Sequence, residues 1–248
     1  MRRRLYSQNF LRDAATVARV VDVAGLTGTE LVVEPGPGPG ALTRRLAERA
    51  KTVVAYERDA RLADRLARRA PPNVTCEQAD FRAVAPPGVP FHLVGNIPFS
   101  ITADIVAWCL AAAELCSATM LTQAEYARKR TGGYHRWTRL TVSTWPEYDW
   151  TFHGGVDRRV FDPVPRVDGA IMRLTRRDRP LIPVARLPEW RRGVEAGFSG
   201  VGGNLAASLA RVHPRRKVTA AFRRAGIDPR VPVGYVSPGD WLALFAHL

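Results

Sequence analysis

Residues 30–40 read ELVVEPGPGPG, a β-branched run that ends in a turn of alternating glycine and proline. The following ALTRRLAERA has apolar residues at helical spacing, so the stretch predicts a strand, a tight turn and a helix. The same order recurs along the first two thirds of the chain. Further strands are predicted in KTVVAYERD, VTCEQADF, FHLVGNIPF and SATMLTQ, and further helices in AATVARVVDVA, RLADRLARRA and ITADIVAWCLAAA. The alternation predicts an α/β fold whose parallel sheet is covered on both faces.

The pattern changes near residue 176. Residues 139–150 and 168–175 are still predicted as strands, but a charged, proline-bearing segment follows, and helical patterns dominate after it. We therefore predict two domains, residues 1–176 and residues 177–248. Residues 173–248 contain 14 Lys and Arg against 5 Asp and Glu, so the smaller helical domain carries most of the excess positive charge.

The whole chain is strongly basic. Its 248 residues include 37 Lys and Arg and 23 Asp and Glu, a formal net charge of +14. This excess favours nucleic acid as a partner, and an anionic membrane second, although an arginine-rich genome would also produce solvated basic residues. No run of about 18 apolar residues predicts a membrane span. The three cysteines have no metal-ligand spacing, so we expect a cytoplasmic protein with reduced thiols and no metal site.

Glycines and carboxylates mark the ends of three predicted strands. Gly36 and Gly38 belong to a G-x-G-x-x-G/A match, and Glu57 ends the next strand, where it can accept hydrogen bonds from ribose hydroxyls. To this point an NAD enzyme and an S-adenosylmethionine enzyme fit equally well. Glu34, two residues before the first glycine, and Asp80, at the end of the third strand, favour S-adenosylmethionine. Asp80 can accept a hydrogen bond from the adenine amine.

Residues 96–99, NIPF, follow the next predicted strand. An adenine amine is a poor nucleophile because it shares its lone pair with the ring, and two acceptors aimed at its hydrogens would free that pair. Asn96 offers a side-chain carbonyl and the peptide around Ile97-Pro98 a backbone carbonyl. Phe99 offers a face on which an unstacked base can lie. We therefore predict Asn96, Ile97, Pro98 and Phe99 as catalytic residues for methylation of an amino group.

Six segments together resemble one family. They are SQNFLRD at 7–13, VVEPGPGPGALT at 32–43, YERD at 56–59, QADF at 78–81, GNIPFSIT at 95–102 and FDPVPRVDGAI at 161–171. In them the chain resembles the erythromycin-resistance (Erm) type of ribosomal RNA adenine N6-methyltransferase. The resemblance implies a Rossmann-like S-adenosylmethionine-dependent methyltransferase domain, with a mostly parallel seven-stranded sheet, and a small helical C-terminal domain. It implies cofactor contacts by Asn9, Leu11, Gly36, Glu57, Asp80 and Asn96.

The resemblance also implies a substrate and a phenotype. The family methylates one adenine of 23S ribosomal RNA and so blocks macrolide, lincosamide and streptogramin B binding; the segment from Phe161 borders the target base. Relatives often carry Tyr where Phe99 stands and Ser or Cys where Gly169 stands, which leaves mono- against dimethylation open. We expect a monomer. We expect RNA phosphates to be held by the C-terminal domain, through Arg215, Arg216 and Lys217, with Arg2–Arg4, Arg82 and Arg128–Arg130 as the alternative.

Other functions stay open from the sequence alone. The first is a housekeeping dimethyltransferase for 16S RNA of the small subunit, and the second is a catalytically silent RNA-binding factor on the same fold. DNA adenine methylation is disfavoured, because Ile97 replaces the first proline of the usual N/D-P-P-Y/F/W motif. An NAD dehydrogenase is last, since no acid–base pair for hydride transfer is recognisable.

Overall fold

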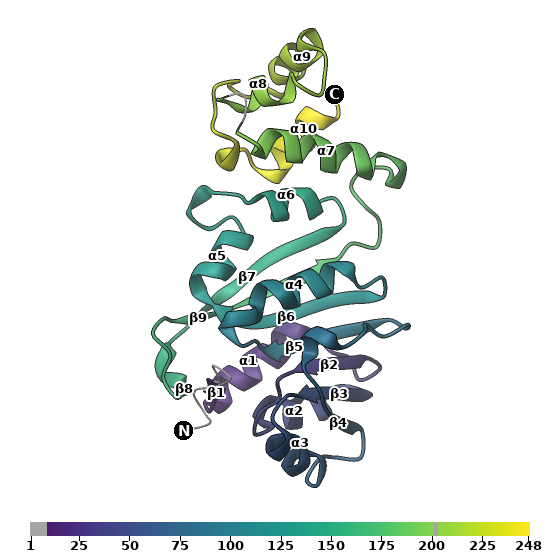
Figure 1. The fold of residues 1–248 in the computed structure, drawn as a ribbon, viewed down its shortest axis with the longest axis vertical. Helices are drawn as coiled ribbons and strands as arrows, with labels where there is room; N and C mark the ends of the chain where they lie inside the picture. The colour runs from purple at the N-terminus through teal and green to yellow at the C-terminus, as the bar shows by residue number, and fades with distance from the viewer. Residues whose placement is uncertain (1–8, 201–202) are drawn as a thin grey trace. The chain divides into compact units, whose positions relative to one another are not determined.

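The computed structural model describes residues 9–200 and 203–248 (Figure 1). The chain folds into two compact units. The first, here the sheet unit, comprises Met1–Ala127 and Thr151–Arg176, and the second, the helical unit, comprises Arg128–Trp150 and Arg177–Leu248. The chain thus crosses between the units after residue 176, where the sequence pattern changes, and also after residues 127 and 150. The role of residues 177–248 as an RNA-binding domain stays a prediction.

A seven-stranded sheet forms the centre of the sheet unit. The neighbouring pairs β3/β4, β2/β3, β2/β5 and β5/β6 are parallel, and β9 runs antiparallel to β6. The predicted mostly parallel seven-stranded sheet is therefore confirmed. In spatial order the strands are β4 (Val74–Gln78), β3 (Thr52–Glu57), β2 (Leu31–Pro35), β5 (Phe91–Asn96), β6 (Leu115–Gln123), β9 (Gly169–Arg176) and β7 (Tyr148–Val156).

Helices α1 (Ala14–Ala24), α2 (Ala41–Ala47), α3 (Ala60–Ala67) and α4 (Thr102–Ala111) follow the predicted pattern, and α5 (Ala124–Arg130) crosses from one unit to the other. Local chemistry sets their ends. Asp13 caps α1 by accepting from the Thr16 N–H, and Gly25 ends it at φ 64°, a left-handed conformation that glycine adopts without steric cost. The buried faces of α1 and α2 contact β-branched residues of the central strands, including Val32 and Val53, in one hydrophobic core.

Two short strands bring distant parts of the chain together. β1 (Phe10–Leu11) pairs antiparallel with β8 (Phe161–Asp162), with Leu11 opposite Phe161. The Arg12 N–H donates to the Val160 carbonyl at 3.0 Å, which extends the pairing. The segments around Asn9 and Phe161 thus lie side by side although about 150 residues separate them.

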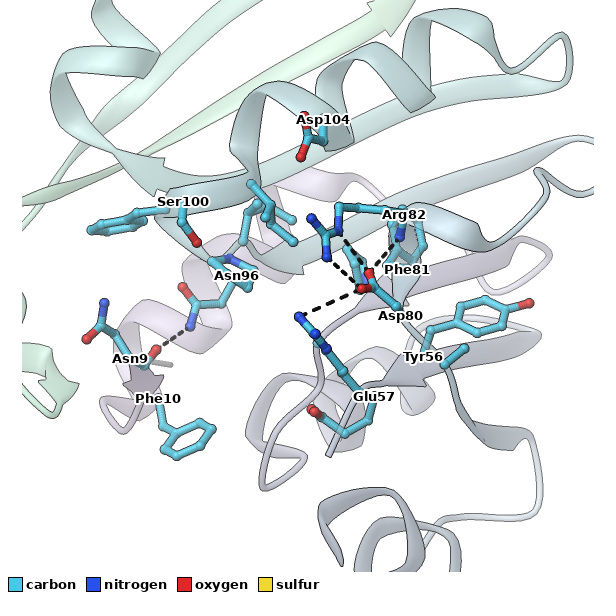
Figure 2. A pocket seen from close by; sticks show the side chains of 18 residues that line it. Asn9, Phe10, Tyr56, Glu57, Asp80, Phe81, Arg82, Asn96, Ser100 and Asp104 are labelled. Atoms are coloured by element: carbon cyan, nitrogen blue, oxygen red, sulfur yellow. Dashed lines mark hydrogen bonds and ion pairs between the residues drawn. The ribbon is translucent and has the colours of Figure 1, made fainter. Parts of the chain in front are cut away.

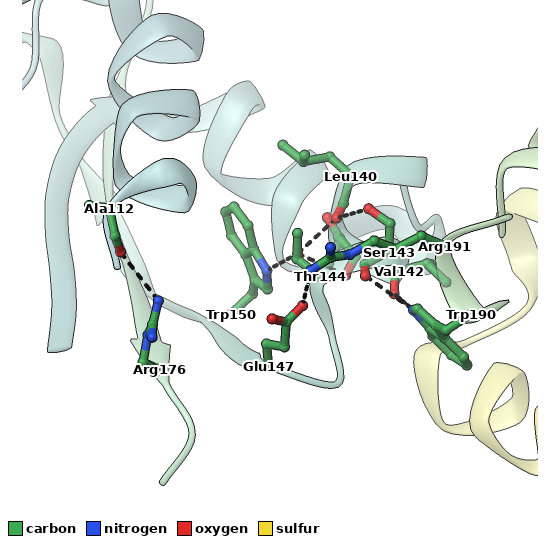
Figure 3. Close-up of polar contacts among 11 residues, drawn as sticks. Ala112, Leu140, Val142, Ser143, Thr144, Glu147, Trp150, Arg176, Trp190 and Arg191 are labelled. Atoms are coloured by element: carbon green, nitrogen blue, oxygen red, sulfur yellow. Dashed lines mark hydrogen bonds and ion pairs between the residues drawn. The ribbon is translucent and has the colours of Figure 1, made fainter. Parts of the chain in front are cut away.

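The helical unit contains α6 (Arg139–Thr144), α7 (Leu187–Phe198), α8 (Leu205–Leu209), α9 (Arg215–Ala225) and α10 (Pro238–Phe245). The strand predicted over residues 139–150 is wrong for its first half, which is α6. Thr138 caps that helix, and the Trp190 indole N–H donates to the Val142 and Ser143 carbonyls, both at 3.1 Å (Figure 3). A tertiary contact thus satisfies carbonyls in the last turn and outweighs the β-propensity of a Thr- and Val-rich segment. None of the described helices is long and apolar enough to cross a membrane.

Candidate active site

A cavity of about 390 Å³ opens at the carboxyl edge of the sheet (Figure 2). After β2 the chain builds β3 and β4 on one side and then returns to place β5 on the other, so the strand order reverses between β2 and β5. Ligands of open α/β sheets bind at such a switch point. The cavity is lined by Asn9, Phe10, Pro35, Gly36, Tyr56, Glu57, Arg58, Ala79, Asp80, Phe81, Arg82, Asn96, Ile97, Pro98, Phe99, Ser100, Ile101 and Asp104.

The glycine loop between β2 and α2 forms one wall. Gly36, Gly38 and Gly40 have φ of 65°, 55° and 81°, a region that side chains with a Cβ rarely adopt. A Cβ on Gly38 would lie 2.8 Å from the Phe10 ring, so this glycine also allows a close approach of the N-terminal segment. The Gly38 N–H donates to Glu57 Oε2 at 2.9 Å and thereby ties the loop to the end of β3.

Glu57 is buried, with 2% of its surface exposed, and lies at the end of β3. Its two oxygens accept from different backbone groups, Oε2 from Gly38 N–H and Oε1 from Asp59 N–H, both at 2.9 Å. Burial raises the pKa of Glu57, and these backbone donors oppose the rise. The backbone of Arg58 also donates to this carboxylate. A carboxylate has about four acceptor sites, so Glu57 keeps acceptor capacity for a ligand, which suits a ribose hydroxyl.

Glu34 lies behind the cavity, fully buried in β2, and does not line the cavity. Burial, reinforced by the charge of Glu57, raises the pKa of Glu34 to about 8. Its Oε2 has no hydrogen-bond partner among the described residues. The side chain is therefore held largely as a neutral acid near pH 7.

Asp80 follows β4 and is held by Arg82. Its Oδ1 accepts from the Arg82 backbone N–H and Nε, both at 3.1 Å, and its Oδ2 accepts from Nη2 at 2.7 Å (Figure 2). These bonds, with Coulombic help from Arg82 and Arg58, lower the pKa of Asp80 to about 2. The group is an anion at every physiological pH.

Asn96 ends β5 and has a fixed orientation. Its side-chain Nδ2 donates to the backbone carbonyl of Asn9 at 2.8 Å (Figure 2). Because a carbonyl can only accept, the amide nitrogen must face Asn9, which leaves Oδ1 as the acceptor of the side chain. The β1/β8 pairing that fixes the Asn9 segment thus also orients Asn96.

The remaining predicted catalytic residues, Ile97, Pro98 and Phe99, also line the cavity. The Ile97 N–H donates to the Leu121 carbonyl at 2.9 Å, and the Pro98 carbonyl accepts from the Ile101 N–H at 3.0 Å, so the loop is held to β6 and to the turn that follows. Phe99 is half-buried and meets Phe161 edge to face, with ring centroids 6.2 Å apart and planes at 75°. Its other surface lines the cavity.

Most of the predicted residues meet at this cavity. Asn9, Gly36, Glu57, Asp80 and all of Asn96–Phe99 line it. Leu11 is buried in the hydrophobic core, and Phe161 does not line the cavity but contacts Phe99, which does. Arg215, Arg216 and Lys217 are exposed in the first turn of α9, in the helical unit. Arg128 and Arg130 belong to the helical unit rather than to the sheet unit, and Arg2–Arg4 lie outside the described residues.

Several lining residues were not predicted as part of a cofactor site. Arg58, Phe81 and Arg82 follow the ends of β3 and β4 and lie within two residues of a predicted position, so the strand-end rule could have included them. Phe10 lies in β1, next to the predicted Asn9. Asp104 lies in the first turn of α4 and carried no signal in the sequence.

Comparison with known proteins points to one family. The chain matches the ribosomal RNA adenine dimethylase family over residues 1–248. It is 52% identical to an rRNA methyltransferase of Streptomyces thermotolerans, over 100% of this chain and 83% of that protein. It is also 52% identical to an rRNA adenine N-6-methyltransferase of Saccharopolyspora erythraea, over 99% of this chain and 65% of that protein. The crystal structure of the 23S rRNA methyltransferase ErmE has a TM-score of 0.94 and 52% identity, over 97% of this chain and 99% of that one.

These matches extend over the sheet unit and the helical unit alike, and they confirm the family resemblance that the six motifs indicated. The chain belongs to the ribosomal RNA adenine dimethylase family and, within it, to the Erm type of rRNA adenine N6-methyltransferase.

Proposed function

We propose that this protein transfers methyl groups from S-adenosylmethionine to N6 of an adenine in 23S ribosomal RNA. The observation that carries the proposal is the meeting of Glu57, Asp80 and Asn96 at one cavity, at the switch point of the sheet. Relatives that are 50 to 52% identical over the aligned residues, named as rRNA adenine N-6-methyltransferases and as a 23S rRNA methyltransferase, support it.

The residues of the cavity fit S-adenosylmethionine. Two carboxylates at neighbouring strand ends suit a nucleoside, Glu57 for the ribose hydroxyls and Asp80 for the adenine amine. The left-handed Gly36 leaves the wall beside Pro98 without a side chain. The volume of about 390 Å³ lies in the range of small-molecule sites. When bound, the cofactor supplies a methyl group on a sulfonium whose leaving group is a neutral thioether.

The chain's own groups then act on the target base. Asn96 Oδ1 accepts one hydrogen of the adenine amine, and the Ile97 carbonyl accepts the other, since the Pro98 carbonyl is already bonded to Ile101. These two acceptors draw the nitrogen toward tetrahedral geometry and free its lone pair. Phe99 holds the base by stacking, which offsets part of the few kcal/mol that unstacking costs.

We propose resistance to macrolides, lincosamides and streptogramin B as the consequence. Added methyl groups enlarge the amine and remove its hydrogens, so a drug that packs against the base or bonds to it loses its site. Expressing the wild-type protein in a susceptible host should raise the inhibitory concentration of all three drug classes. Asn96→Ala, expressed at the same level, should not.

The decisive test is incubation of the protein with labelled S-adenosylmethionine and protein-free ribosomal RNA of each size, followed by mapping of the modified base. We expect label at one adenine of 23S RNA. Label confined to 16S RNA would identify a small-subunit enzyme instead. Cofactor binding without label in either RNA would identify a catalytically silent RNA-binding factor.

A further inference from the structure

Two arginines flank Asp80 in the cavity, and the proposed function uses neither. Arg82 lies in the turn after β4 and holds Asp80 with three hydrogen bonds. Arg58 follows Glu57 at the end of β3, and its Nη1 lies 3.7 Å from Asp80 Oδ2. Both side chains line the cavity.

The acceptor sites of Asp80 are nearly filled. A carboxylate has about four lone-pair sites, two on each oxygen. Arg82 takes both sites of Oδ1, through its backbone N–H and Nε, and one site of Oδ2 through Nη2. Arg58 Nη1 faces the fourth site at 3.7 Å, which is an ion-pair distance but too long for a hydrogen bond.

The position of Arg58 limits where an adenine can lie. The base must reach from Glu57, which takes the ribose, to Asp80, which takes the amine, and Arg58 is the residue directly after Glu57 with its charged end beside Asp80. An amine that takes the last site of Asp80 therefore brings the adenine ring against the guanidinium. A guanidinium is planar and stacks on aromatic faces.

We infer that Arg58 is a cofactor-contacting residue whose guanidinium lies against the face of the adenine ring, while Arg82 fixes Asp80 for the amine. The inference rests on the proposed function, because it requires S-adenosylmethionine in this cavity. It assigns the two arginines different tasks: Arg82 fills acceptor sites and positions the carboxylate, and Arg58 yields the last acceptor site to the ligand and stacks on it.

The test measures binding of S-adenosylhomocysteine by calorimetry to Arg58→Met, which keeps an unbranched apolar stem and removes the charged, planar guanidinium. We expect Arg58→Met to bind roughly 2- to 30-fold more weakly, the range that cation–π contacts span from exposed to desolvated sites. Arg58→Lys keeps the charge without the planar group, and its affinity should lie between those of the wild type and Arg58→Met. Arg61→Met is the matched control, since Arg61 carries the same charge on α3 but does not line the cavity, and it should bind like the wild type.

Equal or tighter binding by Arg58→Met would overturn the inference, and tighter binding would mean that Arg58 only competes for Asp80. An equal loss in Arg61→Met would overturn it too, by assigning the effect to net charge. Glu57→Ala separates this failure from that of the proposed function. If Glu57→Ala weakens binding and Arg58→Met does not, the cofactor site stands without Arg58. If the wild-type protein binds no S-adenosylhomocysteine, the proposed function itself has failed.

Discussion

At the scale of single residues, the site depends on groups whose hydrogen bonds fix what they can still do. Asn96 is the plainest case, since its amide nitrogen is held toward the Asn9 carbonyl, which fixes the direction of the Oδ1 acceptor. Glu57 and Asp80 likewise bind backbone or arginine donors before any ligand arrives. Such pre-orientation lowers the reorganisation needed as the reaction proceeds.

Asn96→Ala should therefore reduce the single-turnover methylation rate by roughly 100-fold or more, because an acceptor aimed at the changing amine matters most in the transition state. RNA affinity, measured by filter binding, should change little. Ser100→Ala is the matched control, as Ser100 lines the same cavity but has no assigned role. A near-normal rate for Asn96→Ala would place the catalytic acceptor elsewhere.

Glu34 gives a prediction about stability and pH. Its pKa is about 8 in the folded protein against an ordinary 4.5, so between these values the native state binds more protons than the unfolded state. The free energy of unfolding should then fall as pH rises from about 5 to 8, by at most about 1.4 kcal/mol per pH unit from this group. Glu34→Gln should flatten that fall in denaturant titrations at several pH values.

Glu30→Gln is the control for this pH dependence. Partial burial opposes ionisation of Glu30, but hydrogen bonds from Thr27 and from the Gly28 N–H outweigh it and lower its pKa to about 2. The contribution of Glu30 to the free energy of unfolding is therefore complete above the pKa that it has in the unfolded chain, and it is lost only as pH falls toward 2. Glu30→Gln should leave the slope between pH 5 and 8 unchanged, and an unflattened slope in Glu34→Gln would contradict the assignment.

At the scale of elements, the β2–α2 loop links the fold to the site. Gly38→Ala would force an L residue into φ 55° and bring its Cβ to 2.8 Å from the Phe10 ring, displacing the loop or the N-terminal segment. We expect it to destabilise the protein by more than about 1 kcal/mol, the cost of the left-handed conformation alone, and to weaken S-adenosylhomocysteine binding. Gly28→Ala carries a positive φ of 97° but meets no atom within 4 Å. Gly28→Ala should therefore lower stability without weakening S-adenosylhomocysteine binding. Equal affinities for both variants would mean that the β2–α2 loop does not contribute to cofactor binding.

At the scale of the whole molecule, the distribution of charge gives a prediction about RNA binding. Arg215, Arg216 and Lys217 are exposed in the first turn of α9, where cations meet the positive end of the helix dipole and gain nothing in stability. Replacing all three by Gln should leave the thermal midpoint unchanged or slightly raised. If they contact phosphates, the slope of log affinity against log salt should become shallower by about 2 to 3, with cofactor binding unaffected.

The alternative set of basic residues makes the comparison decisive. Replacing Arg82, Arg128 and Arg130 by Gln removes the same charge as the α9 variant. Because Arg82 also holds Asp80 and Arg130 donates to Thr138, the stability and cofactor affinity of this variant must be measured alongside its salt slope. A wild-type salt slope in the α9 variant, with a shallower slope in this one, would assign the phosphate contacts to the second set of residues.

The sequence by itself determined the α/β architecture, the strand ends that carry Gly36, Glu57, Asp80 and Asn96, and the family. These features are local: β-branched runs, helical spacing and glycine turns act over a few residues, and parallel strands place their carboxyl ends at one edge. Tertiary structure decided what local patterns cannot encode. The Trp190 indole stabilises a helix where residues 139–144 favour a strand, and the β1/β8 pairing orients Asn96 across the chain. The approach of Arg58 to Asp80 and the burial that keeps Glu34 protonated likewise arise only once separate segments have packed together, because both depend on which groups exclude water and which face each other.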